Sequence, residues 1–381
     1  MYDSGFLQFS WACSSKKSST DERELDDDVA AERNQILNNM NLSSARNSIG
    51  PDRDVNRLDH LIVHDLVKSY PLHRAAAVDH LTFGARRGEA FGLLGYNGAG
   101  KTTTFRIVVG DLMATEGTAY IDGQNIRRRL TSIRRLGYCP QQDCSMDFLT
   151  VRDSFYLLAR IRGVSRKRID SMVSYMITLF LLESFDNNYI HQLSGGTKRR
   201  LHAALALIGP PLVAILDEPT TGVDPNARQQ MQKVFLNAVK AQMTIILTSH
   251  SMDECERVCN RLGIMKSGQL TCLGTIQHLK SKFGRGYMVS IQVQSIANDS
   301  NASNMHSVLS FLRDQNQFQI EVKEILKTTG QFQILESTPA ELFELLEQNK
   351  ERLNIETYTI SQTTLEQIFL SLGKTNSTND S

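Results

Sequence analysis

One glycine-rich segment restricts the fold more than any other part of the sequence. From Gly95 to Thr102 the chain reads G-Y-N-G-A-G-K-T, a G-x-x-x-x-G-K-T motif. The motif follows an apolar run, Ala90–Leu94, that suits a buried strand, and it leads into Thr102–Val109, which suits a helix. A strand, a tight glycine loop and a helix in this order predict an α/β domain built on a buried, largely parallel sheet.

The residue types in this loop predict a site for the phosphates of a nucleotide. Glycines at Gly95, Gly98 and Gly100 let the backbone turn tightly, so that its N–H groups and the start of the helix can surround phosphate oxygens. We expect Lys101 to reach the β- and γ-phosphates and Thr102 to ligate Mg²⁺. The other loop residues expected to line the site are Tyr96, Asn97, Ala99 and Thr103. The alternative, a glycine-rich turn with an accidental lysine, fits the flanking strand and helix less well.

Two adjacent carboxylates follow a second apolar run. Val213–Leu216 suits a buried strand, and Asp217 and Glu218 come directly after it. In an open parallel sheet the ligand crevice lies at the carboxyl ends of the strands, so both acids are expected there. Asp217 suits the Mg²⁺ shell, and Glu218 can align and deprotonate the water that attacks the γ-phosphate. Acids at a strand end are more often helix caps or loop residues, and only the accompanying motifs favour the catalytic interpretation.

A short turn ahead of a helix predicts a second anion site. Leu193–Thr197 reads L-S-G-G-T and precedes a basic run and an apolar helix face. Ser194 and the bare backbone of Gly195 and Gly196, at a helix N-terminus, can hold an anion. In isolation the five residues could equally be a helix-capping turn. The basic groups that we expect to be solvated faces, without a role in binding nucleic acid, are Arg127–Arg129, Arg134–Arg135 and Lys198–Arg200.

The L-S-G-G-T turn and the I-L-D-E-P strand end that follows it make the sequence resemble the ABC ATPases. The resemblance implies a P-loop α/β core that binds ATP, with a helical subdomain at about residues 143–200. In that family the signature turn of one domain faces the γ-phosphate held by the phosphate loop of another, so that two domains pair head to tail around ATP. It therefore implies that Ser194, Gly195 and Gly196 complete the site of a second nucleotide-binding domain.

The same resemblance assigns roles to four further residues. Gln141, in Y-C-P-Q, is similar to the glutamine that contacts Mg²⁺ and the attacking water, and His250 is similar to the histidine that contacts the γ-phosphate. Tyr70 stands where the family has an aromatic ring that stacks on adenine, and Asp224 stands in the loop that links the two composite sites. Each of them alone could be a surface or core residue, and a core tyrosine remains a real alternative for Tyr70.

Several segments resemble the class A members of the family in particular. They are Gly95–Phe105, Gly137–Gln141, Asp217–Gly222 and Ser361–Phe369. The upstream segment Asp27–Arg33 is similar to the linker between their last transmembrane helix and their second nucleotide-binding domain. Since class A members move phospholipids, sterols and related lipids, the resemblance implies an ATPase that powers lipid transport. Its partners would be transmembrane domains, and its location would be the cytosolic face of a membrane.

Two positions depart from the common family pattern. Thr197 stands where many members have glutamine, and Gly222 and Val223 precede Asp224 where Ala-Leu is common. Neither change removes a catalytic group, so the paired site is expected to hydrolyse ATP. Three alternatives stay open: a soluble ABC ATPase acting in translation or DNA repair, a stand-alone subunit that assembles with separate membrane proteins, and a nucleotide-binding module that is inactive alone.

Changes in composition along the chain predict the domain boundaries. Residues 1–59 are polar with an acidic run and are expected to be a largely disordered linker, with room for a short helix at Val29–Asn39. Residues 60–283 carry the α/β pattern and the motifs of the ATPase domain. Residues 284–373 predict the order β-α-β-β-α-β of a ferredoxin-like regulatory domain that ends in a docked helix, and residues 374–381 a disordered tail.

Composition excludes several other classes of function. Hydrophobic residues make up 41% of the chain, which is enough for a sizeable core, and a net charge of +1 gives no electrostatic reason to expect nucleic acid. The six cysteines lack C-x-x-C spacing, so ordinary reduced thiols are expected rather than a zinc site. No apolar run reaches the roughly 20 residues that a membrane-spanning helix needs, and the amino terminus lacks the basic residues of a secretory signal.

Overall fold

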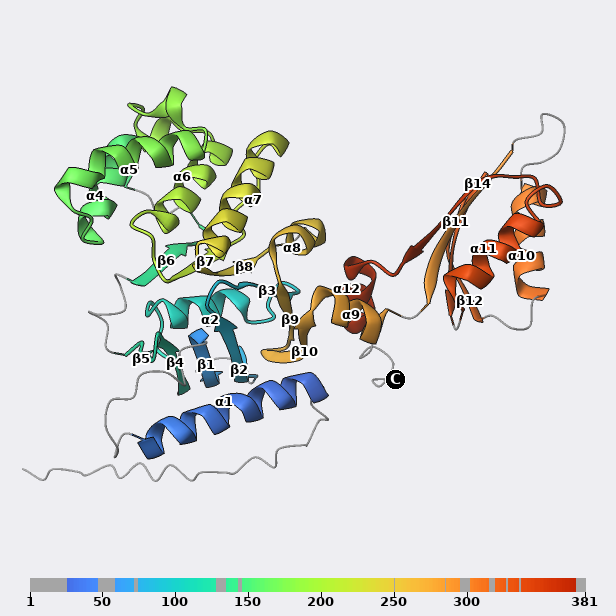
Figure 1. The fold of residues 1–381 in the computed structure, drawn as a ribbon, viewed down its shortest axis with the longest axis horizontal. Helices are drawn as coiled ribbons and strands as arrows, with labels where there is room; N and C mark the ends of the chain where they lie inside the picture. The colour runs from blue at the N-terminus through green and yellow to red at the C-terminus, as the bar shows by residue number, and fades with distance from the viewer. Residues whose placement is uncertain are drawn as a thin grey trace, which may run out of the picture.

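The computed structural model describes most of the 381-residue chain. The described residues are 26–46, 59–71, 75–127, 135–142, 146–249, 251–284, 286–294, 302–314, 319–326, 328–335 and 337–374. They form three sheets, of four, six and four strands, with helices around them (Figure 1). Within these residues no helix combines the length and the apolar character needed to cross a bilayer. The expectations for residues 1–25, His250 and residues 375–381 lie outside them.

A six-stranded sheet forms the centre of the larger lobe, with the strand order β10-β9-β3-β8-β7-β6. The strands are β3 (Ala90–Gly95), β6 (Leu136–Cys139), β7 (Val213–Asp217), β8 (Thr244–Thr248), β9 (Arg261–Lys266) and β10 (Gln269–Thr275). Every residue of β3, β7 and β8 is buried, as near-continuous apolar runs in a parallel sheet should be. Because Asp217 of β7 pairs with Thr248 of β8, both strands deliver their last residues to one edge. The expected α/β core is confirmed.

A second sheet, of four antiparallel strands in the order β2-β1-β4-β5, packs against the central one. Its strands are β1 (Asp59–Lys68), β2 (Val78–Arg86), β4 (Glu116–Ile121) and β5 (Gln124–Asn125). Phe83 of β2 stacks on Phe91 of β3 with 5.1 Å between the ring centroids. Phe105 of α2 (Lys101–Val108) belongs to the same buried cluster. This cluster holds in place the helix that begins at Lys101.

Helices form a separate layer beyond β6, β7 and β8 (Figure 1). They are α4 (Val151–Ile161), α5 (Arg166–Leu179), α6 (Gly195–Leu207), α7 (Pro225–Lys240) and α8 (Met252–Val258), with short turns of 3-10 helix at Glu183–Phe185 and Ile190–Gln192. On α4, Phe155 is buried, whereas Leu157 and Ile161 are exposed. Helix α6 runs on to Leu207 and packs against β6 and β7.

The N-terminal segment contains a docked helix, α1 (Asp27–Arg46), which is longer than the short helix expected at Val29–Asn39. Helix α1 contacts β2 and β10, and Val29 and Ile36 are buried against them. Glu32 accepts hydrogen bonds from the Arg261 guanidinium at 2.8 Å and from a backbone N–H of β2 at 3.1 Å. Most residues of α1 are polar, so its sequence has only a weak apolar periodicity. Long-range polar contacts such as these hold the helix in place.

The C-terminal lobe has the predicted order of elements. It contains β11 (Tyr287–Val293), α10 (Ala302–Asp314), β12 (Gln319–Ile325), β13 (Thr329–Leu335), α11 (Pro339–Gln348) and β14 (Ile355–Gln362). The four strands pair antiparallel in the order β12-β13-β11-β14, which is the ferredoxin-like arrangement. Val289, Phe332 and Leu342 are fully buried between the sheet and its helices.

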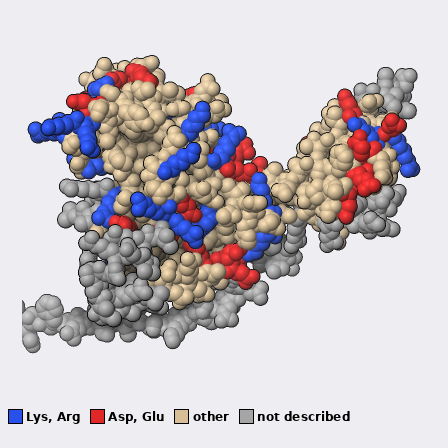
Figure 2. Space-filling view, viewed as in Figure 1, with Lys and Arg blue, Asp and Glu red and all other residues tan. Residues whose placement is uncertain are grey.

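One further helix, α12 (Leu365–Lys374), leaves the C-terminal lobe and packs against the larger one. It contacts α8 and α9 (Ile276–Phe283), and the Leu365 N–H donates to the Glu256 carboxylate at 3.4 Å. Leu365 and Ile368 are buried in this contact. Helices α9 and α12 lie together between the two lobes (Figure 1), where the space-filling view shows the molecule to be narrow (Figure 2).

Candidate functional site

The glycine loop connects β3 to α2 in a conformation that requires glycine. Gly98 and Gly100 have φ values of +81° and +103°, in the region that other residues rarely adopt. A Cβ atom on Gly100 would lie 2.3 Å from the carbonyl oxygen of Ala77. Gly100 is also the N-cap of α2 and offers no capping side chain, so amides of the first turn remain available for an anion.

Lys101 lies at the base of this loop and is almost fully buried, with 8% of the residue exposed. Its ammonium group donates to the carbonyl oxygens of Gly95 at 2.7 Å and Tyr96 at 3.2 Å. Burial lowers the pKa of Lys101, and the nearby carboxylates of Asp217 and Glu218 oppose that shift. The ammonium group is thus buried beneath the loop, where the negative charge of a bound ligand would stabilise its positive charge.

Asp217 lies at the carboxyl end of β7 between two threonine hydroxyls. Thr102 donates to its Oδ2 at 3.1 Å, and Thr248, at the end of β8, donates to its Oδ1 at 2.5 Å. Burial raises the pKa of Asp217, while both hydroxyl hydrogen bonds and the charge of Arg199 lower it. Thr102 and Asp217, both expected to hold Mg²⁺, therefore lie side by side. Thr248 was not predicted, because its only signal in the sequence is its place at the end of an apolar run.

Glu218 has a backbone conformation that is unusual for a residue with a side chain. Its φ is +51°, which places it in the left-handed region at a cost of about 1–3 kcal/mol. Its N–H reaches the Thr248 hydroxyl at 3.0 Å and the Thr248 carbonyl at 3.1 Å. Its carboxylate accepts a hydrogen bond from the side chain of Gln141 at 3.0 Å. The turn thus aims Glu218 at the residue predicted to act with it.

One cleft of about 750 Å³ brings most of the predicted site residues together. Its lining includes Tyr70, Asn97, Gly98, Ala99, Gly100, Lys101, Thr102, Thr103, Gln141 and Glu218, together with Ala75–Ala77 and Ser267. Because Tyr70 and the glycine loop line the same cleft, a nucleotide bound by its phosphates at the loop could extend toward the aromatic ring. Ala75–Ala77 and Ser267 also line the cleft but were not predicted, because these small residues belong to no motif.

Tyr96 turns away from that cleft. Its ring lies against Phe369 of α12 with 4.5 Å between the centroids, and its hydroxyl donates to the Phe369 carbonyl at 3.4 Å. Among the expected loop residues, Tyr96 therefore presents its backbone to Lys101 and its side chain to the C-terminal helix. A contact between residues so far apart in sequence was not predictable from the loop motif.

The L-S-G-G-T turn lies outside the cleft. Ser194 is the N-cap of α6 and accepts a hydrogen bond from the Thr197 N–H at 3.3 Å. A Cβ on Gly196 would lie 2.7 Å from the carbonyl oxygen of Gly222, so this turn packs against the loop that leads to α7. Asp224 is the N-cap of α7 and accepts from the Ala227 N–H at 3.0 Å. Neither Ser194–Gly196 nor Asp224 is among the described residues that line the cleft.

Comparison with known families agrees with this geometry. Residues 78–221 match the ABC transporter family, and residues 284–362 match the ABCA1-like C-terminal R1 regulatory domain. The chain belongs to the class A ABC transporter family. The match includes both the phosphate-loop lobe and the ferredoxin-like lobe, and α12 follows the end of the second match.

Full-length relatives are much longer than this ABC chain. It is 41% identical to the human retinal-specific phospholipid-transporting ATPase ABCA4 over 92% of its length, and 39% identical to the human phospholipid-transporting ATPase ABCA3 over 91%. These alignments span 15% and 20% of the two relatives. A solved ATP-binding subunit of an ABC transporter superposes with a TM-score of 0.56 at 27% identity, covering 58% of this chain and 92% of that one.

Arg199 of this ABC chain is buried, with 6% of the residue exposed, which corrects the expectation that Lys198–Arg200 is a solvated face. Its side chain crosses from α6 to the end of β7 and donates to the carbonyl oxygen of Glu218 at 2.9 Å. The reason for the error is that the helix turns one of the three basic side chains inward, which a charge count along the sequence does not reveal.

A second buried polar cluster lies beside the described end of β8. Glu254 of α8 is 1% exposed and accepts hydrogen bonds from Thr220 at 2.8 Å and Ser249 at 2.5 Å. Burial raises its pKa, while these two hydroxyl groups lower it. Since Ser249 immediately precedes His250, the cluster fixes the chain up to the histidine that is expected to contact the γ-phosphate. His250 itself lies outside the described residues.

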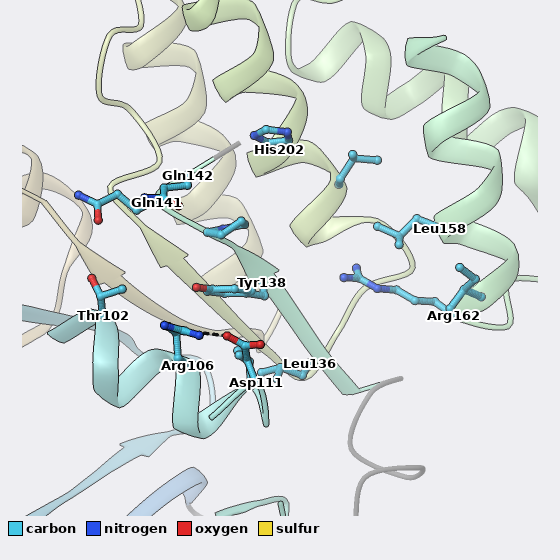
Figure 3. Close-up of a pocket in the computed structure, with 14 residues that line it drawn as sticks. Thr102, Arg106, Asp111, Leu136, Tyr138, Gln141, Gln142, Leu158, Arg162 and His202 are labelled. Atoms are coloured by element: carbon cyan, nitrogen blue, oxygen red, sulfur yellow. Dashed lines mark hydrogen bonds and ion pairs between the residues drawn. The ribbon is translucent and has the colours of Figure 1, made fainter. Parts of the chain in front are cut away.

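A groove of about 820 Å³ separates the phosphate-loop core from the helical layer. Figure 3 shows Arg106 of α2 and the nearby Asp111 on one side, Leu158 of α4 and Arg162 just after it on the other, and Tyr138 between them. Arg162 donates to the Ala206 carbonyl at 2.9 Å, and burial lowers its pKa to about 10. Thr102 and Gln141 line both this groove and the cleft at the glycine loop, so an occupant of the groove would lie next to both residues.

Proposed function

We propose that this chain binds and hydrolyses ATP and that the reaction powers lipid transport by a class A ABC transporter. The observation that carries the proposal is the convergence of the phosphate loop, Asp217, Glu218 and Gln141 at one cleft. Their order along the chain and their family match support it. The name of human ABCA4 describes a phospholipid-transporting ATPase, which supports phospholipid as the transported class.

Mg²⁺ is the metal that the residues of this cleft suit. The Thr102 hydroxyl and the Asp217 carboxylate lie 3.1 Å apart, and Gln141 lines the same cleft. Neutral and anionic oxygen donors of this kind, completed by phosphate oxygens and water, are the ligands Mg²⁺ prefers. When bound, Mg²⁺ would neutralise charge on the β- and γ-phosphates. We assign Thr102, Asp217 and Gln141 to holding it.

The remaining residues have separable tasks in the proposed reaction. Lys101 exchanges its two carbonyl partners for the β- and γ-phosphates, and the amides of Gly98–Thr102 bind the same oxygens. Glu218 accepts the proton of the attacking water, and Gln141 orients that water beside it. Tyr70 lines the same cleft, where its ring can stack on the adenine. His250 would contact the γ-phosphate.

We infer that the working site is shared by two nucleotide-binding domains arranged head to tail. In this chain the turn Ser194–Gly196 lies at an exposed helix N-terminus, away from the residues that line its own cleft. An anion-binding helix start of this kind can complete the site of a partner domain. Asp224 lies next to this turn, at the start of α7, where it would connect the two sites.

The groove between the core and the helical layer fits the proposed transmembrane partner. It is partly apolar, is lined by Leu158 and Ile161, and shares Gln141 with the nucleotide cleft. A short helix of a membrane domain bound there would respond to movements of Gln141. We accordingly place the chain at the cytosolic face of a membrane, with residues 60–283 as the ATPase domain and residues 284–373 as the regulatory domain.

The decisive test replaces the proposed base. We expect Glu218→Gln to bind ATP with unchanged affinity and to lose about 10²–10⁴-fold in steady-state hydrolysis, because general-base catalysis contributes this much. The exposed Glu183→Gln is the matched control and should hydrolyse ATP like the parent chain. The rate per chain should also rise with chain concentration if two domains form each site. Hydrolysis at the parent rate in the Glu218 variant would refute the proposed function.

A further inference from the structure

Arg199 connects the signature helix to the two residues that act on the attacking water. It belongs to the second turn of α6, whose N-cap is Ser194. Its side chain leaves the helix on the inner side and ends among backbone carbonyl groups from two other segments. One segment follows β6 and includes Gln141, and the other is the end of β7 with Glu218.

The guanidinium group of Arg199 donates to four carbonyl oxygens. It reaches Glu218 from Nε at 2.9 Å and Gln141 from Nη1 at 3.2 Å. It also donates to Pro140 from Nη1 and to Asp217 from Nη2. Four acceptors around one planar group fix its position in every direction, because the N–H donors of arginine point along a rigid fork.

The backbone that Arg199 holds needs support. Glu218 has a φ of +51°, a strained conformation that persists only when surrounding contacts determine it. Its neighbour Asp217 is nearly inaccessible to solvent, so the carbonyl groups of both residues depend on donors from the protein. Arg199 supplies these donors.

We propose that Arg199 is a positioning residue for ATP hydrolysis, which fixes the backbones of Glu218 and Gln141 relative to the signature helix. The inference rests on the proposed function and adds a residue to it. Because α6 bears Ser194 at one end and Arg199 one turn later, a partner's nucleotide that moves the signature turn also moves the group that holds Glu218 and Gln141. The two sites of a pair would then be linked through α6.

The adjacent Arg200 provides a matched control. It donates to the Leu181 carbonyl at 2.8 Å and to the Thr197 hydroxyl at 3.1 Å, and its guanidinium lies over the Phe185 ring. Leu181 and Phe185 belong to the helical layer and Thr197 to α6 itself, so none of these partners lies in the segments of Gln141 or Glu218. A comparison of variants at Arg199 and Arg200 therefore distinguishes the loss of contacts with the Glu218 and Gln141 backbones from the general effect of replacing an arginine on α6.

The test compares Arg199→Lys with Arg200→Lys in the full chain. Lysine keeps the charge but presents one ammonium group, which cannot hold four carbonyls in two segments. We expect Arg199→Lys to lower kcat about 10- to 100-fold, the effect of a displaced reacting group, with the Kd for ATP within twofold of the parent value. Arg200→Lys should leave both unchanged. Rates are expressed per bound ATP, so that unfolded chains do not contribute.

A double-mutant cycle distinguishes positioning from a structural defect. If Arg199 acts through Glu218, the Arg199→Lys change should cause no further loss in the Glu218→Gln background, whereas a general defect lowers the residual rate of both backgrounds equally. Amide exchange should also rise at Gly137–Gln141 and Asp217–Glu218 but not in α5.

The experiments distinguish a failure of the role proposed for Arg199 from a failure of the proposed function. An undiminished kcat in Arg199→Lys, or additive losses in the cycle, would overturn the role of Arg199 while leaving the proposed function intact. Parent-like hydrolysis by Glu218→Gln would overturn the proposed function, and this inference with it.

Discussion

Replacing Thr248 with valine should loosen the end of β7 without changing the size of the side chain. Thr248 is fully buried, and its hydroxyl both donates to the Asp217 carboxylate at 2.5 Å and accepts the Glu218 N–H at 3.0 Å. Valine has nearly the same shape, so no cavity forms. The loss therefore measures the hydroxyl hydrogen bonds themselves.

The magnitude follows from what each partner loses. The Glu218 N–H keeps the Thr248 carbonyl at 3.1 Å, so it is not left unpaired. The Asp217 carboxylate loses a hydrogen bond to a charged group, which is worth about 2 kcal/mol. Thr248→Ser keeps the hydroxyl and removes only a methyl group, at a cost of about 1 kcal/mol. We therefore expect valine to destabilise this edge by about 2 kcal/mol, more than serine does.

Amide hydrogen exchange measured by mass spectrometry on β7 and β8 reports this local change without requiring the two lobes to unfold together. A loss of 2 kcal/mol corresponds to about 30-fold faster exchange in Thr248→Val. The difference from the parent chain should grow as the pH rises, because Thr248 lowers the pKa of Asp217 and so favours its ionised form. Exchange in the valine variant that is no faster than in the serine variant would refute the reasoning.

Two further predictions concern other parts of the molecule. Glu254→Gln should remove a pH-dependent loss of stability: burial raises the pKa of Glu254, so the parent's unfolding free energy falls as the pH rises above the ordinary value of 4.5. Urea titrations of parent and variant from pH 4 to 8 check this, and parallel curves would contradict it. Phe369→Ala should weaken the docking of α12 by about 3 kcal/mol and speed proteolysis near Thr363, whereas Tyr96→Phe, which keeps the ring contact, should not. Equal cleavage of the two variants would show that the ring contact is unimportant.

Local sequence was enough to predict those parts of the fold that depend on residues close together along the chain. The glycine loop, the buried strand before it and the strand that ends at Asp217 are confirmed, because motif and apolar run coincide there. The β-α-β-β-α-β order of the C-terminal lobe is confirmed for the same reason, since alternation and helical periodicity are read over a few residues. The roles of Glu218, Gln141 and the signature turn stay predictions.

Long-range polar contacts account for what the sequence did not reveal. Helix α1 is fixed by partners such as Arg261, more than 200 residues away, and a polar helix of this kind looks like a linker until those partners are known. Arg199 was grouped with exposed basic residues because its carbonyl partners lie in two other segments. Thr248 was overlooked because a threonine at a strand end has no motif of its own. In each case tertiary structure decides the role of the residue.

The position of α12 has a mechanical consequence for the regulatory lobe. The chain enters that lobe from α9 and leaves it into α12, and these two helices pack against each other. The two connections are themselves joined, since the Thr363 hydroxyl donates to the Gly286 carbonyl at 3.2 Å. A lobe held by two linked connections resists twisting more than a lobe held by one. A force on the regulatory lobe is therefore transmitted to α12, whose Phe369 contacts Tyr96 of the glycine loop.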